Sequence, residues 1–216
     1  KRRGINVGVS ELLKKPYLAD WWKIIKMQSV SAESKKEMDR SRTETMEFPL
    51  TDVQHAYWVG RNPNQVMGGI SWYLYFEFEC GEIDWQRLSK AWENVQYLHS
   101  SLRTKFLESG TQVIQDKPYN SNIIIYDFQQ LDETEKKEKM EAVRNEYSHK
   151  VLAVERGEVA VLILSVIGKN KTILHFGIDL LVADLKSIKI IFSDLERVYN
   201  DCSFEKLPTP FSLEEH

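Results

Sequence analysis

Residues 171–187 read KTILHFGIDLLVADLKS, and this stretch decides the fold. The first nine residues have the apolar, β-branched character of a buried strand. The side chains that its period of two places on one face are Ile173, His175, Gly177 and Asp179. Four small or apolar residues follow, then Asp184, and apolar residues recur at helical spacing over 185–199. The stretch therefore predicts a strand, a tight corner and a helix, with one carboxylate on each side of the corner.

The two carboxylates of this corner allow two interpretations. Asp184 is well placed as the N-cap of the following helix, where free backbone N–H groups and the helix dipole stabilise its charge by roughly 1 kcal/mol. Ser187 is then an ordinary first-turn residue and Asp179 a solvated strand end. Alternatively, both carboxylates turn toward one cleft and share a site with the helix N-terminus. The residues alone leave both open.

Other segments supply a scaffold for the corner. Residues 159–166 and 171–178 flank Gly168-Lys169-Asn170 and predict a hairpin, and residues 71–80 alternate in polarity as a half-buried strand does. One-sided apolar patterns predict helices near 85–98, 133–150 and 185–199. We expect the three strands in one sheet with the three helices packed against it, an α/β fold of the α+β sandwich type.

The N-terminal part divides into three segments. Residues 1–28 predict two short helices separated by Pro16, the second with an apolar face, and residues 29–47 are a charged linker without apolar periodicity. From residue 48 the main domain begins, with a helix that Thr51 caps and that runs to about Val59. We expect one face of that helix to be lined by Val53, Ala56, Tyr57 and Gly60.

Composition excludes several classes of function. The net charge of -3 argues against a nucleic-acid binder, and the longest apolar run, 159–167, is too short to span a bilayer. Without a recognisable signal peptide, a cytoplasmic location is expected. The two cysteines, Cys80 and Cys202, have no metal-site spacing, and two reduced thiols are favoured over a disulfide.

Four motifs carry a family resemblance. Phe48-Pro49-Leu50-Thr51, Gln54, Ala56-Tyr57 and Gly60-Arg61 resemble the first signature of heterocyclization domains of nonribosomal peptide synthetases. His99, Leu102 and Arg103 fit the second, although Leu98 stands where an arginine is usual. Residues 148–152, SHKVL, are similar to a further string of that family. Asp179, Asp184 and Ser187 match its Asp-x-x-x-x-Asp-x-x-Ser signature, with Leu180 where ordinary condensation domains carry a catalytic histidine.

The resemblance implies a fold and a set of site residues. The fold would be one lobe of a chloramphenicol acetyltransferase-like architecture, in which two lobes form a V around a tunnel for two phosphopantetheine arms. Residues 48–216 would be the N-terminal lobe, without its C-terminal partner lobe. The catalytic candidates are Asp179, Asp184 and Ser187. The candidates for tunnel lining or structural support are Gln54, Tyr57, Arg61, His99, Arg103 and His175.

The implied activity joins a carrier-bound acyl group to carrier-bound cysteine, serine or threonine and cyclodehydrates the product to a thiazoline or oxazoline. No cofactor would bind directly, because the substrates ride on phosphopantetheine arms of an upstream aryl or acyl carrier and a downstream peptidyl carrier. The aspartates would be acid and base, or would hold the corner through a salt bridge to an arginine such as Arg61 or Arg103. A non-catalytic carrier-docking lobe, or a fragment inactive alone, is the alternative function.

Residues 1–28 carry a second resemblance. The pattern Gly4-Ile5-x-Val7, then Leu12-x-x-x-Pro16, then Ala19-Asp20-Trp21-Trp22-Lys23 resembles the last third of aryl carrier proteins of siderophore synthetases. It implies siderophore or related biosynthesis and an aryl donor.

Overall fold

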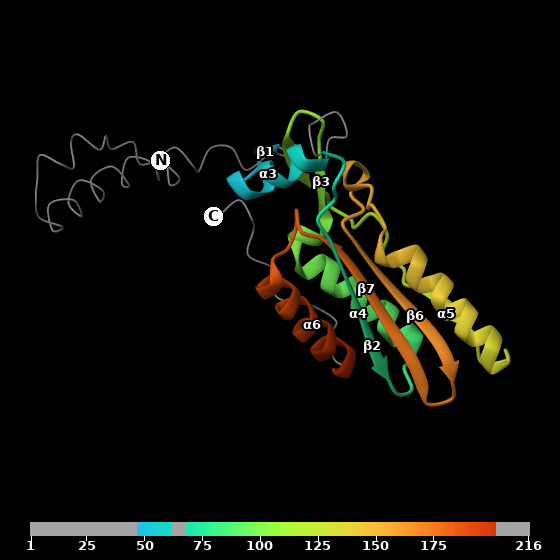
Figure 1. The fold of residues 1–216 in the computed structure, drawn as a ribbon. Helices are drawn as coiled ribbons and strands as arrows, with labels where there is room; N and C mark the ends of the chain where they lie inside the picture. Colours follow the sequence, from blue (N-terminus) through green and yellow to red (C-terminus); the bar gives the residue numbers. More distant parts are fainter. Residues whose placement is uncertain (1–46, 62–67, 202–216) are drawn as a thin grey trace, which may run out of the picture. The chain divides into compact units, whose positions relative to one another are not determined.

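The computed structural model describes residues 47–61 and 68–201, and a four-stranded sheet lies at the centre of this part (Figure 1). Its strand order is β2-β7-β6-β5. The strands are β2 (Tyr73–Cys80), β5 (Ile124–Asp127), β6 (Ala160–Gly168) and β7 (Lys171–Asp179). β7 pairs antiparallel with both β2 and β6, whereas β5 runs parallel to β6. The strand that ends at Asp179 is therefore hydrogen-bonded on both sides.

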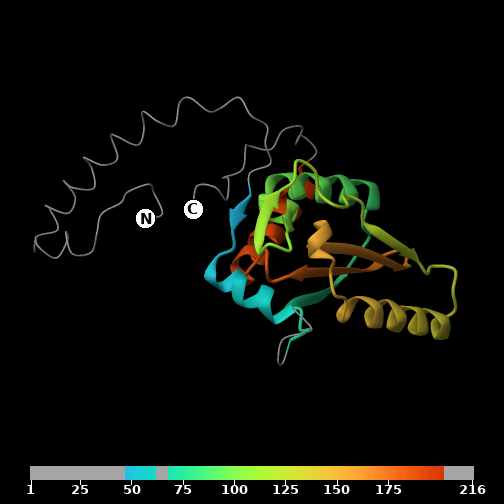
Figure 2. The same cartoon turned by 90° about the horizontal axis from the view of Figure 1, so that it is seen from above.

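Helices α4 and α6 cover one face of this sheet (Figure 2). α4 (Trp85–Leu98) begins at Asp84, whose side chain accepts hydrogen bonds from two backbone N–H groups of the first turn. α6 (Leu185–Asn200) begins at Asp184, whose side chain accepts the backbone N–H of Ser187. Between helices and sheet, Phe176 meets Trp92 and Phe192 edge to face. These aromatic contacts lie within the larger of two apolar clusters.

Helix α5 (Glu133–Ser148) covers the opposite face, so that the sheet lies between it and the other two helices (Figure 2). A capping box of Asp132 and Glu135 starts α5. The second apolar cluster, which includes Tyr147 and Leu152, fills this side. The same face of the sheet also carries buried polar side chains, among them His175 and Asp179.

A smaller sheet of three strands, in the order β1-β4-β3, lies next to helix α3. The segments are β1 (Phe48–Pro49), α3 (Asp52–Arg61), β3 (Thr104–Phe106) and β4 (Thr111–Ile114), with 3-10 turns at Ser100–Arg103 and Val154–Arg156. The expected apolar face of α3 is wrong for Val53 and Ala56, which are exposed. Tyr57 does pack, against Trp72, and Trp58, which was not predicted, stacks on Phe106.

The predicted three-stranded core of the sheet, with helices against it, is confirmed. Two bounds differ from the prediction: the strand expected at 71–80 begins at Tyr73, and the helix expected near 133–150 ends at Ser148. The interpretations of residues 1–28, of most of the 29–47 linker and of Cys202 lie outside the described residues. Within the described part, no helix is long and apolar enough to cross a membrane.

Candidate functional site

The corner is anchored by an ion pair between Asp179, at the end of β7, and Arg61, at the end of α3. Arg61 donates through Nη1 to Asp179 Oδ2 and, at 2.6 Å, to Ser71 Oγ, and through Nη2 to the carbonyl of Leu152 at 2.7 Å. Ser71 Oγ itself donates to Asp179 Oδ2 at 2.9 Å. Asp179 has no exposed surface. The expected solvated strand end is therefore wrong, because the carboxylate is buried and compensated.

The other oxygen of Asp179 shapes the turn that follows. Oδ1 accepts the N–H of Leu181 at 3.0 Å, and the backbone carbonyl accepts the N–H of Val182 at 3.1 Å. Gln54, from α3, donates to the carbonyl of Leu181 at 2.8 Å. The peptide groups of Leu181 are thus held by the first and the last signature of the chain.

Asp184 performs a separate task at the other end of the corner. Its Oδ1 accepts both the backbone N–H and the hydroxyl of Ser187, each at 2.7 Å. The backbone hydrogen bond from Ser187, followed by the hydroxyl bond, lowers the pKa of this exposed carboxyl. Asp184 is the N-cap of α6, and the Ser187 hydroxyl completes the cap.

The structure does not bring the two carboxylates into one hydrogen-bonded group. Asp179 is buried and bonded to Arg61, Ser71 and Leu181, whereas Asp184 is exposed and bonded to Ser187. The expectation of a shared cleft is therefore corrected. The physical reason is that burial obliges Asp179 to face a cation, while Asp184 satisfies N–H groups at the helix start.

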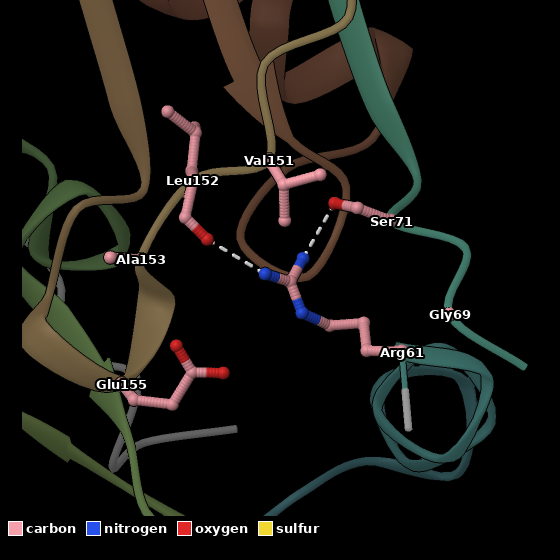
Figure 3. A pocket seen from close by; sticks show the side chains of 7 residues that line it. All are labelled: Arg61, Gly69, Ser71, Val151, Leu152, Ala153 and Glu155. Carbon is pink, nitrogen blue, oxygen red and sulfur yellow. Dashed lines mark hydrogen bonds between the residues drawn. The ribbon is translucent and has the colours of Figure 1, made fainter. Parts of the chain in front are cut away.

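A cavity of about 330 Å³ opens beside the Arg61 guanidinium (Figure 3). Its walls are Arg61, Gly69, Ser71, Val151, Leu152, Ala153 and Glu155. In Figure 3 the guanidinium reaches across toward the Leu152 carbonyl and Ser71, and the Glu155 carboxylate is directed into the same space. The hydrogen bonds of Arg61 all go to protein groups that anchor the corner, and the cavity lies beside this anchor.

His175 lies fully buried on the same sheet face, four residues before Asp179. Its Nδ1 lies 2.7 Å from the hydroxyl of Tyr75, which donates to Glu77 Oε1 at 2.9 Å, and its Nε2 lies 2.9 Å from Ser165 Oγ. That direction places the imidazole proton on Nδ1, with Nε2 accepting from Ser165. Burial lowers the pKa of His175, so the ring is neutral at neutral pH.

The network of His175 ends at the surface in an ion pair. Arg144 of α5 holds Glu77 with two nitrogen–oxygen contacts of 2.7 Å, and its hydrogen bonds are the main cause that lowers the pKa of Glu77. His175 therefore supports the sheet and its contact with α5. It does not contact the residues of the corner directly.

The remaining predicted residues lie around the corner or away from it. His99 caps the C-terminus of α4 and pairs with Asp194 of α6 at 2.9 Å. Arg103 donates to the carbonyl of Gln115 at 2.5 Å and not to Asp179, and burial lowers its pKa. Tyr57 contacts Trp72, whose carbonyl accepts the N–H of Leu180, so that Tyr57 reaches the corner through one neighbour.

Several residues that hold the site escaped prediction from the sequence. Ser71 precedes β2 and bonds to Asp179, the Leu152 carbonyl bonds to Arg61, and Gln112 of β4 pairs with Gln54. Ser71 and Gln112 belong to no motif. Leu152 ends the SHKVL string, but it acts through its backbone carbonyl, which leaves no trace in residue identity. The part of the chain that the structure describes holds no group of three or more residues suited to a metal ion.

Comparisons with known proteins identify the family of this chain. A family model named Condensation domain matches residues 44–212. Pyochelin synthetase PchE of Pseudomonas aeruginosa is 30% identical over 214 residues, which cover 99% of this chain and 15% of PchE. Phenyloxazoline synthase MbtB of Mycolicibacterium paratuberculosis is 30% identical over 223 residues, covering 100% of this chain and 19% of MbtB. The chain thus spans less than a fifth of these two relatives.

Among solved structures, the EpoB NRPS cyclization-docking bidomain from Sorangium cellulosum is similar, with a TM-score of 0.71 and 26% identity. The match covers 94% of this chain and 40% of that one. It confirms the fold class predicted from the sequence, a mixed sheet with helices on both faces arranged as in condensation domains.

Proposed function

Because this chain belongs to the condensation domain family of nonribosomal peptide synthetases, as its signatures predict, we propose that it is the N-terminal lobe of a heterocyclization domain. The corner carries this proposal. It has the Asp-x-x-x-x-Asp-x-x-Ser order of such domains, and Leu180 stands where an ordinary condensation domain has its catalytic histidine. The likeness to a cyclization domain, EpoB, supports it further.

The reaction that we propose has two stages. The amine of cysteine, serine or threonine on a downstream carrier attacks the thioester carbonyl of an acyl group on an upstream carrier, and the upstream phosphopantetheine thiol leaves. The side-chain thiol or hydroxyl then adds to the carbonyl carbon of the new amide. The former carbonyl oxygen departs as water and a C=N bond closes the thiazoline or oxazoline, which requires proton transfers to oxygen and from nitrogen.

The geometry favours a holding role for the two aspartates in this reaction. Asp179 is buried, and both of its oxygens accept hydrogen bonds from the protein, so it has no exposed oxygen with which to contact a substrate directly. Asp184 has its pKa lowered, which makes it a poor proton donor at neutral pH. We therefore propose that both aspartates fix the corner and that the proton-transfer groups belong to the C-terminal lobe.

We also propose the domain organisation and partners that the sequence predicted. Residues 1–28 would end an upstream carrier domain, residues 29–47 would be the linker, and residues 48–216 the lobe itself. The alignment with PchE covers 99% of the chain and so includes the proposed carrier segment. PchE and MbtB are named as pyochelin and phenyloxazoline synthases, and we propose a related role for this chain in siderophore biosynthesis, with an aryl donor and two carrier partners.

The test uses the complete protein with its holo carriers, one loaded with an aryl group and the other with cysteine, serine or threonine in turn. Mass spectrometry of the released product separates the linear amide from the heterocycle, which is lighter by one water. The heterocycle is expected with at least one of the three amino acids. Linear amide alone would show an ordinary condensation domain, and no coupling at all would favour the carrier-docking lobe.

A further inference from the structure

We propose that Gln112, on strand β4, is a positioning residue for the corner and acts on it through Gln54. Gln112 belongs to none of the signatures, and 3% of its surface is exposed. The inference rests on the proposed function, since it assigns Gln112 a part in placing the turn on which cyclodehydration depends. Its evidence is a set of hydrogen bonds that joins the smaller sheet to the turn after β7.

Gln54 uses the full capacity of its side-chain amide. Its Oε1 accepts from the backbone N–H of Thr51 and from Gln112 Nε2, both at 3.0 Å. Its Nε2 donates to the carbonyl of Leu181 at 2.8 Å and to Gln112 Oε1 at 3.1 Å. A glutamine amide offers two donors and about two acceptor positions, so none is left unused.

Gln112 reinforces the direction in which that amide faces, together with the Thr51 N–H and the Leu181 carbonyl. The two side chains exchange a donor and an acceptor in both directions, and the second N–H of Gln112 donates to the carbonyl of Pro49 at 3.3 Å. A reversed Gln54 amide would set oxygen against the Gln112 oxygen and against the Leu181 carbonyl, and two carbonyl oxygens repel each other. Gln112 thereby helps to keep the donor of Gln54 on Leu181.

The turn depends on this contact because Leu181 is fixed at both of its peptide groups. Asp179 binds its N–H at 3.0 Å and Gln54 binds its carbonyl at 2.8 Å. The Leu181 side chain is buried in the cluster under α5. Among these contacts the Gln54 bond is the one that comes from α3, so its loss leaves the carbonyl side of the turn without that support.

The experiment compares Gln112→Ala, Gln54→Ala and the double variant in the complete protein with loaded carriers. We expect each single variant to lower the ratio of heterocycle to linear amide by about tenfold, the factor that corresponds to one or two net hydrogen bonds. The double variant should match Gln54→Ala, because Gln112 acts through Gln54. Gln115→Ala, on the residue just after β4, is the matched control and should leave the ratio unchanged.

A second measurement separates this inference from the proposed function. Hydrogen exchange at the amides of Leu181 and Val182 should quicken by about tenfold in Gln112→Ala, and not in Gln115→Ala. Faster exchange in a protein that never forms a heterocycle would refute the proposed function and support the positioning role. Unchanged exchange and ratio in Gln112→Ala, or a double variant whose effects simply add, would overturn the positioning role.

Discussion

Arg61 and Asp179, which are 118 residues apart in the sequence, meet as a buried ion pair at the end of strand β7. The arginine closes helix α3 and the aspartate closes β7, so the pair joins the first and the last signature of the chain. Ser71 adds a hydroxyl to the same carboxylate oxygen. The two motifs therefore form one structural unit, in which a helix end fixes a strand end.

Replacing Arg61 tests this ion pair. Arg61→Met leaves the Asp179 carboxylate buried without its cation, which should lower the free energy of unfolding by about 3–5 kcal/mol. Urea unfolding measures the change. Arg103→Met is the matched control, since Arg103 donates to the backbone carbonyl of Gln115 rather than to a carboxylate, and it should cost less.

The double variant Arg61→Met/Asp179→Asn should recover part of that loss, because the uncompensated charge is removed together with its partner. If Arg61→Met and Arg103→Met were equally destabilising, and Asp179→Asn recovered nothing, the ion pair would not be the anchor of the corner.

Substitutions at Asp184 distinguish a helix-capping role from a role in proton transfer. Asparagine caps helices as well as aspartate does, so Asp184→Asn should keep both stability and heterocycle formation, whereas Asp184→Ala should lose about 1 kcal/mol. Asp84→Ala, at the N-cap of α4, should cost a similar amount of stability. A folded Asp184→Asn protein that makes linear amide and no heterocycle would instead assign Asp184 to the chemistry.

The Asp184 carboxyl should also make the stability of the folded protein depend on pH, in a direction that its pKa shift determines. Its folded-state pKa is lowered, chiefly by the hydrogen bond from the Ser187 backbone. Its contribution to stability is therefore present at neutral pH and is lost as the pH falls through the folded-state value. In Asp184→Asn this acid-side loss should be smaller, and acid titration of the melting temperature measures it.

The periodicity of the sequence predicted the main strands and helices, because these elements follow from local patterns of apolar residues. The alternation in 71–80 and the one-sided helices follow from burial of one face, and an aspartate before a helix predicts its own cap. The hairpin of β6 and β7 and the Asp184 cap could therefore be read from the sequence.

The partners in the site could not be read in this way, because they depend on which distant segments meet. The sequence left Arg61 and Arg103 as equal candidates for Asp179, and the position of α3 next to the strand end decides for Arg61. The apolar face of α3 was predicted correctly at Tyr57 but wrongly at Val53, because Trp58 stacks on Phe106 while Val53 stays exposed. Tertiary packing overrides the helical pattern in so short a helix.

His175 should make stability pH-dependent on the acid side. Burial lowers its folded-state pKa below the unfolded value of about 6.5, so the unfolded chain binds the proton more readily. The free energy of unfolding should therefore fall as the pH drops through the unfolded-state pKa, and it should level off below the folded-state pKa. The groups that face the ring are Tyr75 and Glu77 of β2, Ser165 of β6 and Arg144 of α5.

The measurement is urea unfolding of the wild type and of His175→Gln across this pH range. The substituted protein should be less stable at pH 7, because Tyr75 and Ser165 lose their partner, but its stability should change less with pH. An equal pH dependence in both proteins would show that other groups cause the acid loss.

A substitution at Gly177 of β7 tests how closely the Tyr73 side chain of β2 packs against β7. A Cβ at this position would lie 1.7 Å from the hydroxyl oxygen of Tyr73 and 2.5 Å from its Cζ, so the ring passes directly over the glycine. Gly177→Ala must displace this ring and should cost about 1–3 kcal/mol, the usual penalty for overpacking. Gly168→Ala is the control, because a Cβ there meets nothing within 4 Å.

Removing the ring should relieve the clash at Gly177. Tyr73→Ala alone loses burial, but Gly177→Ala added to it should cost much less than in the wild type, and a double-mutant cycle by urea unfolding gives the coupling energy. Since Tyr73 is the register partner of Asp179, the displaced ring should also disturb the corner and lower heterocycle yield in Gly177→Ala. Independent, additive costs of the two substitutions would show that the ring is free to move away from β7 and does not constrain the corner.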